Sequence, residues 1–490
     1  MKINLAVLFG GKSVEHEVSV ISAVQAMASI NKEKYNIIPV YMTKSNEFWT
    51  GEKLMDINAF KDIPALLKEC TECVFVRSEG KVQLIRQKMK KFGSNLISDI
   101  DVAFPIVHGT NVEDGALQGY LHTLDLPYVG CDVLASAIGM DKFVMKILLK
   151  DAGFPVLDCL RFSAFEIDRI EELADKVEAK FDYPVIVKPI NLGSSVGISK
   201  ASDRSGLLNS MEEAFQFSDR ILVEPAVVQL KEINCSVVGD SEEAEASVCE
   251  EPVQASEDDI LSFNQKYVGG GKSGGSKGMA TLKRKIPAEI TPEQDEYIRK
   301  IAVDAFRYLG CNGVTRIDFM IDMATDKIYI NEINTIPGSL AFYLWEPKGV
   351  KYTALLDWRI ARILTGEEIC PEIYGLMEKA LGRLGGLLEE TAAGQLSVRS
   401  EKYTTLVMEC LILAGLSMQL QGNSRPASGA EHHLSHFWEM HVINKPTDAL
   451  HGEQVGVAAL MLTRYYHAMR DYDFMRPVNL AATFDRSYLE

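Results

Sequence analysis

The 490-residue sequence predicts an α/β protein whose last part is all-α. Residues 3–30 have the pattern of a buried strand, a Gly-Gly turn and a helix, which is how an α/β unit begins. From about residue 155, short apolar strands alternate with helical segments. Beyond about Leu355 the strand pattern disappears, and helical periodicity continues to Tyr466. We therefore expect α/β domains up to about residue 355 and an all-α appendage after them.

Local patterns predict the individual elements in chain order. A second strand–helix passage begins at Asn36, and residues 132–153 have the pattern of one helix, which ends before Pro155. Residues 313–334 have the pattern of two strands joined by a turn at 324–326. The other predicted strands are short and apolar, at 101–109, 183–189, 221–224 and 232–238.

Composition and charge exclude several classes of protein. A chain with 47% hydrophobic and 24% charged residues is expected to fold rather than to be disordered. The net charge of −17 argues against a broad nucleic-acid-binding face. No stretch has the ~18 uncharged apolar residues of a membrane-spanning helix, and the N-terminus is charged too early for a signal peptide. Nine scattered cysteines predict reduced thiols and a cytoplasmic protein.

A glycine loop after a strand is one candidate phosphate site. Lys188 ends a predicted strand, and Ser194 and Ser195 follow in a loop between Gly193 and Gly197. Glycine lets backbone N–H groups approach phosphate oxygens, and lysine supplies positive charge. An ordinary hairpin would show the same pattern, so both interpretations stay open here. The basic, glycine-rich residues 269–278 are likewise either a linker or a mobile lid.

The two predicted strands of 313–334 carry a second candidate site. Residues two apart in a strand share a face, so Arg316 points with Asp318, and Glu332 points with Asn334. Two carboxylates and an amide oxygen suit Mg²⁺, which takes a few protein oxygens together with substrate phosphates. The neighbouring arginine could neutralise a transferring phosphoryl group. The alternative is an exposed polar face of a sheet.

Seven sequence blocks in chain order resemble the D-alanine–D-alanine ligases of the ATP-grasp superfamily. They are LFGGKSVEHEVS (8–19), HGTNVEDGALQG (108–119), PYVGCDVLASAIGMDK (127–142), VIVKPINLGSSVGISK (185–200), QKY (265–267), RIDFMID (316–322) and NEINTIPGS (331–339). The resemblance implies ATP-dependent joining of two D-alanines through an acyl phosphate, for peptidoglycan precursor synthesis. It also implies two Mg²⁺ or Mn²⁺ ions and a cytoplasmic homodimer that acts on small molecules, with no nucleic-acid or membrane partner.

The resemblance assigns roles position by position. Glu15 would orient the amino group of the first D-alanine, and Ser194 and Tyr267 would join it in a trio that closes the site. Arg316 and the N–H of Gly338 would hold the tetrahedral intermediate. The metal ligands would be Asp318, Glu332 and Asn334. The nucleotide-binding positions would be Lys142, Lys188, Glu224, Glu232 and Lys266.

One segment departs from the family pattern. After Gly338 the family usually continues with a run containing Ser and His that holds the acceptor's carboxylate, whereas this chain has SLAFYLW at 339–345. The acceptor is therefore open, and D-serine or D-lactate are alternatives to D-alanine. Tyr267 resembles the members that accept an amine, which favours an amino acid.

The C-terminal part resembles the helical domain of glycerol-1-phosphate dehydrogenases. The matching text is KYTALLDWRIARILTGEEICPEI (351–373) and SRPASGAEHHLSHFWEMH (424–441), and His432 and His451 match two metal ligands of that family. Its third ligand is an aspartate, where this chain has Pro347, and no NAD-binding loop is found. A natural fusion, a remnant and a sequence artefact all stay open. So do a bifunctional enzyme and, as a non-catalytic alternative, an inactive ligase that serves as a scaffold.

Together these patterns predict four parts. They are an N-terminal α/β substrate domain (1–125), a central ATP-grasp domain (126–225), a C-terminal ATP-grasp domain with the metal and nucleotide site (226–357), and a helical dehydrogenase-like fragment (358–490).

Overall fold

The computed structural model describes residues 2–252 apart from 79 and 92, residues 284–365, and six isolated positions between 383 and 409. The chain divides into two compact units, Met1–Glu368 and Ile369–Glu490. Within the described residues, no helix combines the length and apolar character needed to span a membrane. The described cysteines are all free thiols.

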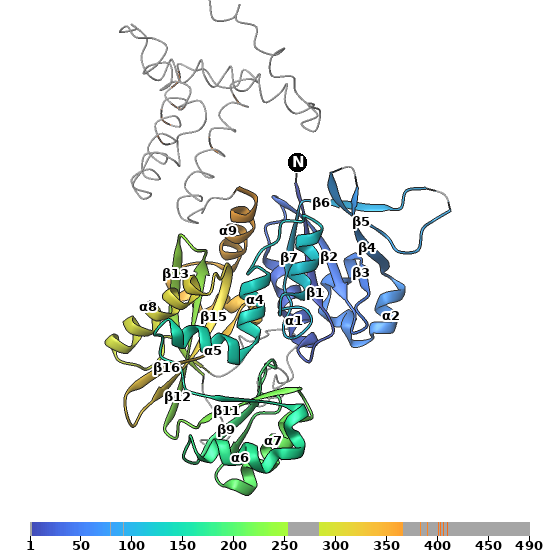
Figure 1. Ribbon diagram of the computed structural model, residues 1–490. Helices are drawn as coiled ribbons and strands as arrows, with labels where there is room; N and C mark the ends of the chain where they lie inside the picture. The colour runs from blue at the N-terminus through green and yellow to red at the C-terminus, as the bar shows by residue number, and fades with distance from the viewer. Residues whose placement is uncertain are drawn as a thin grey trace, which may run out of the picture. The chain divides into compact units, whose positions relative to one another are not determined.

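A seven-stranded sheet forms the N-terminal domain (Figure 1). Its parallel part, β1 (Ile3–Gly10), β2 (Tyr35–Met42) and β7 (Val102–Pro105), is buried, and α1 (His16–Ser29) follows the Gly-Gly turn as predicted. The helix expected directly after β2 is wrong. An antiparallel arm follows instead, made of β3 (Phe48–Thr50), β4 (Thr71–Ser78), β5 (Lys81–Arg86) and β6 (Leu96–Ile100). The helices α2 (Ile63–Lys68) and α3 (Ala116–Thr123) complete this region.

A four-stranded antiparallel sheet carries the glycine loop. Its strands are β8 (Leu160–Ser163), β9 (Val185–Pro189), β10 (Ser199–Ala201) and β11 (Arg220–Pro225), and β9 and β11 lie at its centre. The helices α6 (Ile170–Glu178) and α7 (Arg204–Phe215) bury their apolar faces against it. The predicted strands at 183–189 and 221–224 are confirmed, and residues 190–198 form the loop between β9 and β10.

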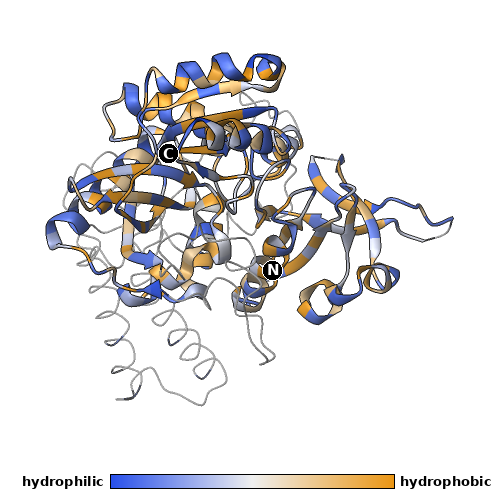
Figure 2. Ribbon diagram, turned by 90° about the horizontal axis from the view of Figure 1, so that it is seen from below, coloured by the Kyte–Doolittle hydropathy of each residue, from blue (hydrophilic) through white to orange (hydrophobic). Residues whose placement is uncertain are grey.

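A five-stranded antiparallel sheet carries the metal candidates. In spatial order its strands are β14 (Arg284–Lys285), β13 (Ala244–Pro252), β12 (Leu230–Gly239), β15 (Gly313–Asp322) and β16 (Lys327–Asn334). The helix α8 (Pro292–Tyr308) packs on it, and α9 (Tyr352–Thr365) lies near the end of the first compact unit. The hydropathy colouring of Figure 2 shows α-helices that alternate between hydrophobic and hydrophilic residues, as expected for one buried face.

The helix predicted over 132–153 is two helices, α4 (Val133–Met140) and α5 (Lys142–Asp151). The break lies at Asp141, whose extended backbone lets its carboxylate accept hydrogen bonds from the N–H groups of Phe143 and Val144 at 3.1 and 3.0 Å. This N-cap starts a new helix. Both helices pack into the core of the five-stranded sheet, α4 through Ala135 and α5 through Met145 and Leu149. The predicted domain limits stay predictions, although α9 is continuous across residue 357.

Candidate active site

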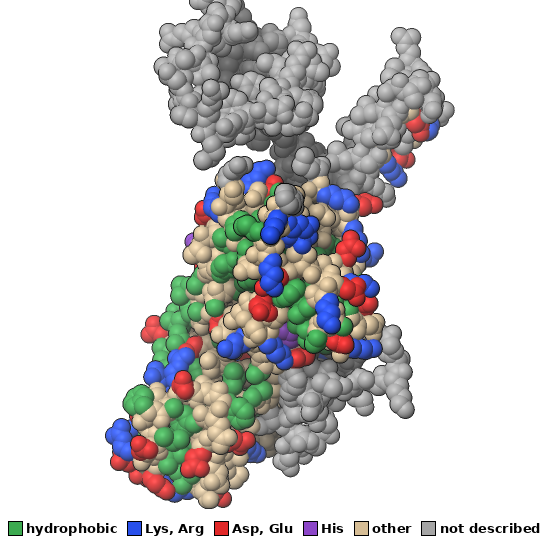
Figure 3. Space-filling view, turned by 90° about the vertical axis from the view of Figure 1, so that its right-hand side faces the viewer, with side chains coloured by type: hydrophobic (Ala, Val, Ile, Leu, Met, Phe, Trp, Pro, Cys, Tyr) green, Lys and Arg blue, Asp and Glu red, His purple; other side chains and the backbone are tan. Residues whose placement is uncertain are grey.

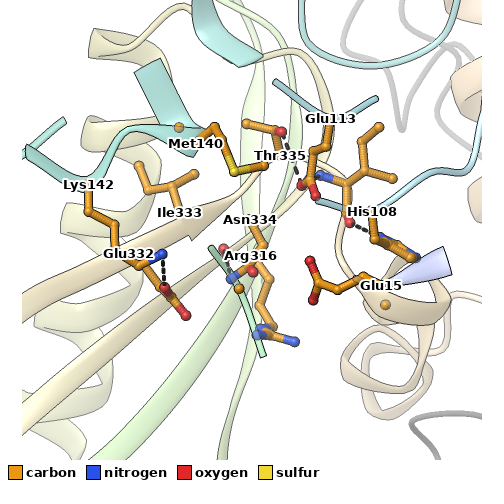
Figure 4. Close-up of a pocket in the computed structure, with 14 residues that line it drawn as sticks. Glu15, His108, Glu113, Met140, Lys142, Arg316, Glu332, Ile333, Asn334 and Thr335 are labelled. Atoms are coloured by element: carbon orange, nitrogen blue, oxygen red, sulfur yellow. Dashed lines mark hydrogen bonds and ion pairs between the residues drawn. The ribbon is translucent and has the colours of Figure 1, made fainter. Parts of the chain in front are cut away.

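A pocket lies where these sheets meet (Figure 4). Loops of the N-terminal domain, the start of α5, the glycine loop and the β15–β16 hairpin all contribute to its wall. The polar residues that line it are Glu15, His108, Glu113, Lys142, Arg316, Glu332, Asn334 and Thr335. Sequence segments more than 300 residues apart therefore form one polar cavity.

The β15–β16 hairpin brings the four predicted side chains together. In its register Asp318 faces Glu332 and Arg316 faces Asn334. The Arg316 guanidinium contacts both carboxylate oxygens of Asp318 at 2.7 Å, and Asn334 Nδ2 donates to Asp318 Oδ2 at 3.1 Å. Burial raises the pKa of Asp318, and the neighbouring Glu332 adds to this, while Arg316 opposes both. An additional positive charge near the pair would therefore stabilise both carboxylates.

The donor chemistry of this hairpin fits Mg²⁺. Asp318, Glu332 and Asn334 offer two carboxylates and one amide oxygen on adjoining strands. Within the described ranges, no group of three or more His, Cys, Asp or Glu side chains is placed to hold a metal alone. That is the arrangement expected for Mg²⁺, which shares its coordination between one or two carboxylates, water and substrate phosphates.

Lys142 links the glycine loop to the metal candidates. It is the first residue of α5, and its buried ammonium donates to the carbonyl of Leu192 at 2.8 Å. The same ammonium is 3.1 Å from Glu332 Oε2, as Figure 4 shows. A lysine between a glycine loop and a candidate metal-binding carboxylate is well placed to contact a bound phosphate.

A second cluster of buried lysines lies between α5 and the four-stranded sheet. Glu224 Oε1 is 2.5 Å from Lys188 Nζ, and Glu224 Oε2 is 2.9 Å from Lys146 Nζ. Burial alone would raise the pKa of Glu224, but the two ammonium groups outweigh it and lower that pKa to about 2. Burial lowers the pKa of Lys146, against the attraction of Glu224. Lys146 was not predicted, because a lysine in a helix is usually solvated and its partner is 78 residues away.

Glu15 and Ser194 meet across two domains. Ser194 Oγ donates to Glu15 Oε1 at 2.5 Å, and the Ser194 backbone is left-handed, with φ of 55°. The loop approaches so closely that a Cβ added to Gly193 would lie 2.8 Å from Glu15 Oε2. Tyr267, the third member of the predicted trio, and Lys266 lie outside the described residues.

His108 and Glu113 were not predicted as site residues, although both lie in the HGTNVEDGALQG block. His108 Nδ1 donates to the carbonyl of Ile336 at 2.7 Å, and its Nε2 is 3.1 Å from Ser22 Oγ. Burial lowers the pKa of His108 to about 4, so it is neutral. Glu113 accepts from the N–H of Ile336 at 2.8 Å, and burial together with the charge of Glu15 raises its pKa to about 7. Both residues join the N-terminal domain to the end of β16.

The remaining predicted site residues are Gly338, Glu232, His432 and His451. Gly338 lines the pocket and begins a buried 3-10 turn (Gly338–Leu344), in which residues 339–341 have φ near 50°. Glu232 lies on β12 opposite Met320 and is not among the pocket-lining residues. His432 and His451 lie outside the described residues.

Two antiparallel sheets that meet at the pocket, with Lys142 beside the Glu332 carboxylate and Lys188 beside Asn331, form the architecture of an ATP-grasp enzyme. The protein-family model for the D-ala D-ala ligase N-terminus matches residues 4–131. The family model for the D-ala D-ala ligase C-terminus matches residues 148–361. The chain therefore belongs to the D-alanine–D-alanine ligase family. The "D-alanine--D-alanine ligase" of Thermosipho melanesiensis is 38% identical over 72% of this chain and 92% of its own length.

Two solved structures extend the comparison. The D-alanine-D-alanine ligase from Coxiella burnetii has a TM-score of 0.61 at 27% identity, and covers 74% of this chain and 94% of its own. The VanG D-Ala:D-Ser ligase from Enterococcus faecalis also has a TM-score of 0.61, at 30% identity, and covers 74% of this chain and all of its own. The matched residues of the family models end at residue 361.

Proposed function

We propose that this protein is an ATP-dependent ligase that joins two D-alanines into D-alanyl-D-alanine for peptidoglycan precursor synthesis. The observation that carries the proposal is that one pocket combines Glu15 of the N-terminal domain with Arg316, Glu332 and Asn334 of the hairpin. A substrate amino group and a phosphorylated carboxylate can thus be held in the same cavity. Family membership supports the same chemistry.

The reaction has two steps. The carboxylate of the first D-alanine attacks the γ-phosphorus of ATP, which gives an acyl phosphate and releases ADP. The amine of the second D-alanine then attacks the acyl carbon, the bond to phosphate breaks, and inorganic phosphate leaves with the proton of the amine going to solvent. The acyl phosphate is labile in water, so exclusion of water protects the intermediate.

Most of the work of the protein is positioning and charge stabilisation. Asp318, Glu332 and Asn334 would hold two Mg²⁺ or Mn²⁺ ions, which neutralise the triphosphate. The nucleotide would contact Lys142, Lys188, Glu224, Glu232 and Lys266. Glu15 orients the first amino group, with Ser194 and Tyr267 closing the site around it. Arg316 and the N–H of Gly338 hold the oxygens of the tetrahedral intermediate.

The decisive experiment measures phosphate release by the purified protein with ATP, Mg²⁺ and a panel of D-amino acids, with dipeptide identified by mass spectrometry. We expect release that depends on D-alanine. D-serine is the second candidate acceptor, because the VanG D-Ala:D-Ser ligase is 30% identical and SLAFYLW replaces the usual acceptor segment. D-lactate is the third. If the protein binds ATP but releases no phosphate with any D-amino acid, the alternative of an inactive ligase that serves as a scaffold would be favoured.

Ser194→Ala is expected to uncouple ATP hydrolysis from dipeptide formation. The substitution removes the 2.5 Å hydrogen bond to Glu15, which weakens the contact between the glycine loop and the N-terminal domain and should let water reach the acyl phosphate. We expect the ratio of phosphate to dipeptide to rise about threefold or more, an effect of at least ~0.6 kcal/mol on the partition. Tyr267→Phe should act in the same direction.

The matched control is Ser205→Ala, at an exposed serine on α7 of the same sheet domain. It should leave the phosphate to dipeptide ratio unchanged. A Ser194→Ala protein with the coupling ratio of the parent would remove Ser194 from the closing role.

The C-terminal residues form, in this proposal, an inert fragment of dehydrogenase type. Two imidazoles, His432 and His451, are one ligand short of the three that a catalytic zinc site needs, and Pro347 replaces the third. No residues can be assigned to hold a nicotinamide.

Deleting the chain after residue 370 should therefore leave ligase turnover within about threefold, a change of less than ~0.7 kcal/mol in the barrier. The cut falls just beyond the first compact unit, which ends at Glu368. Turnover of full-length and shortened proteins is compared directly. NAD(P)H-dependent reduction of dihydroxyacetone phosphate by the full-length protein, lost on truncation, would instead support a bifunctional enzyme.

We also infer a cytoplasmic homodimer. The free thiols of the described cysteines agree with a reducing compartment, where ATP is also available. On the face shown in Figure 3, Lys and Arg side chains are interspersed with Asp and Glu, so the described residues there present no broad basic surface. That distribution suits small-molecule substrates. Light scattering of the purified protein tests the dimer.

A further inference from the structure

Lys146 is a buried charge to which the reaction assigns no role. Its side chain is 1% exposed, and it lies one helical turn after Lys142, on the same side of α5. Its ammonium is 2.9 Å from Glu224 Oε2. A lysine is seldom buried in a helix unless it is paired, so this position calls for an explanation.

The contact crosses between two domains. Met145 and Leu149 on α5 belong to the core of the five-stranded sheet, whereas Glu224 lies on β11 of the four-stranded sheet. A second contact runs in the opposite direction, from Lys188 on β9 to Asn331 Oδ1 on β16, at 3.2 Å. The two lysines thus reach across the same junction from opposite sides, and both hold Glu224.

The two lysines bind different oxygens of the Glu224 carboxylate, and this arrangement fixes the position of Lys188. Each lysine contacts a different oxygen of the carboxylate, Lys188 at Oε1 and Lys146 at Oε2. If Lys146 were absent, Oε2 would lose its partner and the carboxylate could turn so that both oxygens face Lys188. Lys188 would then be held more tightly by Glu224 and would be less able to reach a phosphate.

The charge of the cluster favours an anionic ligand. Two ammonium groups share one carboxylate, and all three side chains are at most 4% exposed. A cluster built for stability alone would be balanced or apolar, because unneutralised buried charge is costly. The excess positive charge is what a nucleotide phosphate would neutralise.

We propose that Lys146 is a positioning residue for the nucleotide: it fixes the Glu224 carboxylate across the domain junction and thereby keeps Lys188 directed to the phosphates. This inference rests on the proposed nucleotide-binding role of Lys188 and Glu224. It predicts a defect in ATP binding without a defect in D-alanine binding.

The test uses the full-length protein and three variants. Lys146→Met removes the charge and keeps the length of the side chain, and Lys146→Arg restores the charge. Lys150→Met is the matched control, one turn further along α5, where Lys150 pairs with Asp158 at the surface. ATP affinity is measured calorimetrically with Mg²⁺ in the absence of D-alanine, and the KM values for ATP and D-alanine are measured separately.

We expect Lys146→Met to weaken ATP binding and raise the KM for ATP about tenfold, with the KM for D-alanine within about twofold of the parent. Lys146→Arg should recover most of the affinity, and Lys150→Met should equal the parent. Unchanged ATP affinity in Lys146→Met, or an equal loss in Lys150→Met, would overturn the inference.

Two other results, a variant that does not fold and a parent protein without ligase activity, can be distinguished from a failure of the inference. If Lys146→Met does not fold, Lys146→Gln replaces it, since it keeps a hydrogen-bond donor for Glu224, and it should still weaken ATP binding severalfold. Parental ATP affinity in a folded Lys146→Gln protein counts against the role. If the parent binds ATP but forms no dipeptide, the ligase proposal fails, while the ATP affinities of the variants still decide the role of Lys146.

Discussion

Glu332→Gln and Asp318→Asn are each expected to abolish ADP formation, with a loss of about a thousandfold or more in kcat, or roughly 4 kcal/mol in the barrier. Both changes preserve side-chain shape and remove one negative charge from the hairpin. The two metal ions that we propose to neutralise the triphosphate would need that charge to bind. Turnover is measured by ADP release over a range of Mg²⁺ concentrations, and excess Mg²⁺ should recover little of it.

Glu332→Gln is the cleaner of the two variants, because Lys142, which also contacts Glu332, keeps its hydrogen bond to the carbonyl of Leu192. Asp318 also neutralises the buried Arg316 through two 2.7 Å contacts, so its replacement disturbs the fold as well as the metal site. The matched control is Asp326→Asn, in the exposed turn that joins the same strands, where asparagine tolerates the left-handed backbone with φ of 57°. Full ADP formation by Glu332→Gln would remove that residue from the metal site.

The arrangement of the four side chains on the hairpin was predictable because it depends only on residues close together in the sequence. A strand alternates with a period of two, so the shared face of Arg316 and Asp318 follows from their spacing alone. The turn at 324–326 then places Glu332 and Asn334 on the neighbouring strand, and the register confirms that they face the first pair. The glycine loop after Lys188 was predictable for the same reason.

Contacts between distant segments were not predictable from pattern. Lys146 resembles a solvated helix lysine, and only the strand that carries Glu224 makes it a buried one. Glu113 contacts Ile336, 223 residues further along the chain. The break between α4 and α5 was missed because Asp141 sits inside a continuous apolar helical pattern, where its capping role outweighs helix propensity.

Glu224→Gln should destabilise the protein at pH 7 by about 3 to 5 kcal/mol, because it leaves Lys146 and Lys188 buried without a counter-charge. The pKa of Glu224 is about 2 in the folded protein, below its ordinary 4.5. A carboxylate with a lowered pKa stabilises the folded state above pH 4.5, and this contribution is lost as the pH falls towards 2. The parent should therefore lose stability between pH 4.5 and 2, and Glu224→Gln should lose less over the same range.

Chemical unfolding of both proteins at pH 7, 4.5 and 3 measures this difference, and Glu171→Gln is the matched control. Glu171 contacts Arg204 at 2.7 Å in the same domain, but its side chain is 66% exposed, and such surface pairs contribute little. Adding Lys146→Met to Glu224→Gln should restore part of the lost stability, because one buried ammonium then remains instead of two. A Glu224→Gln protein as stable as the parent at pH 7 would show that the two lysines do not depend on Glu224 for their burial.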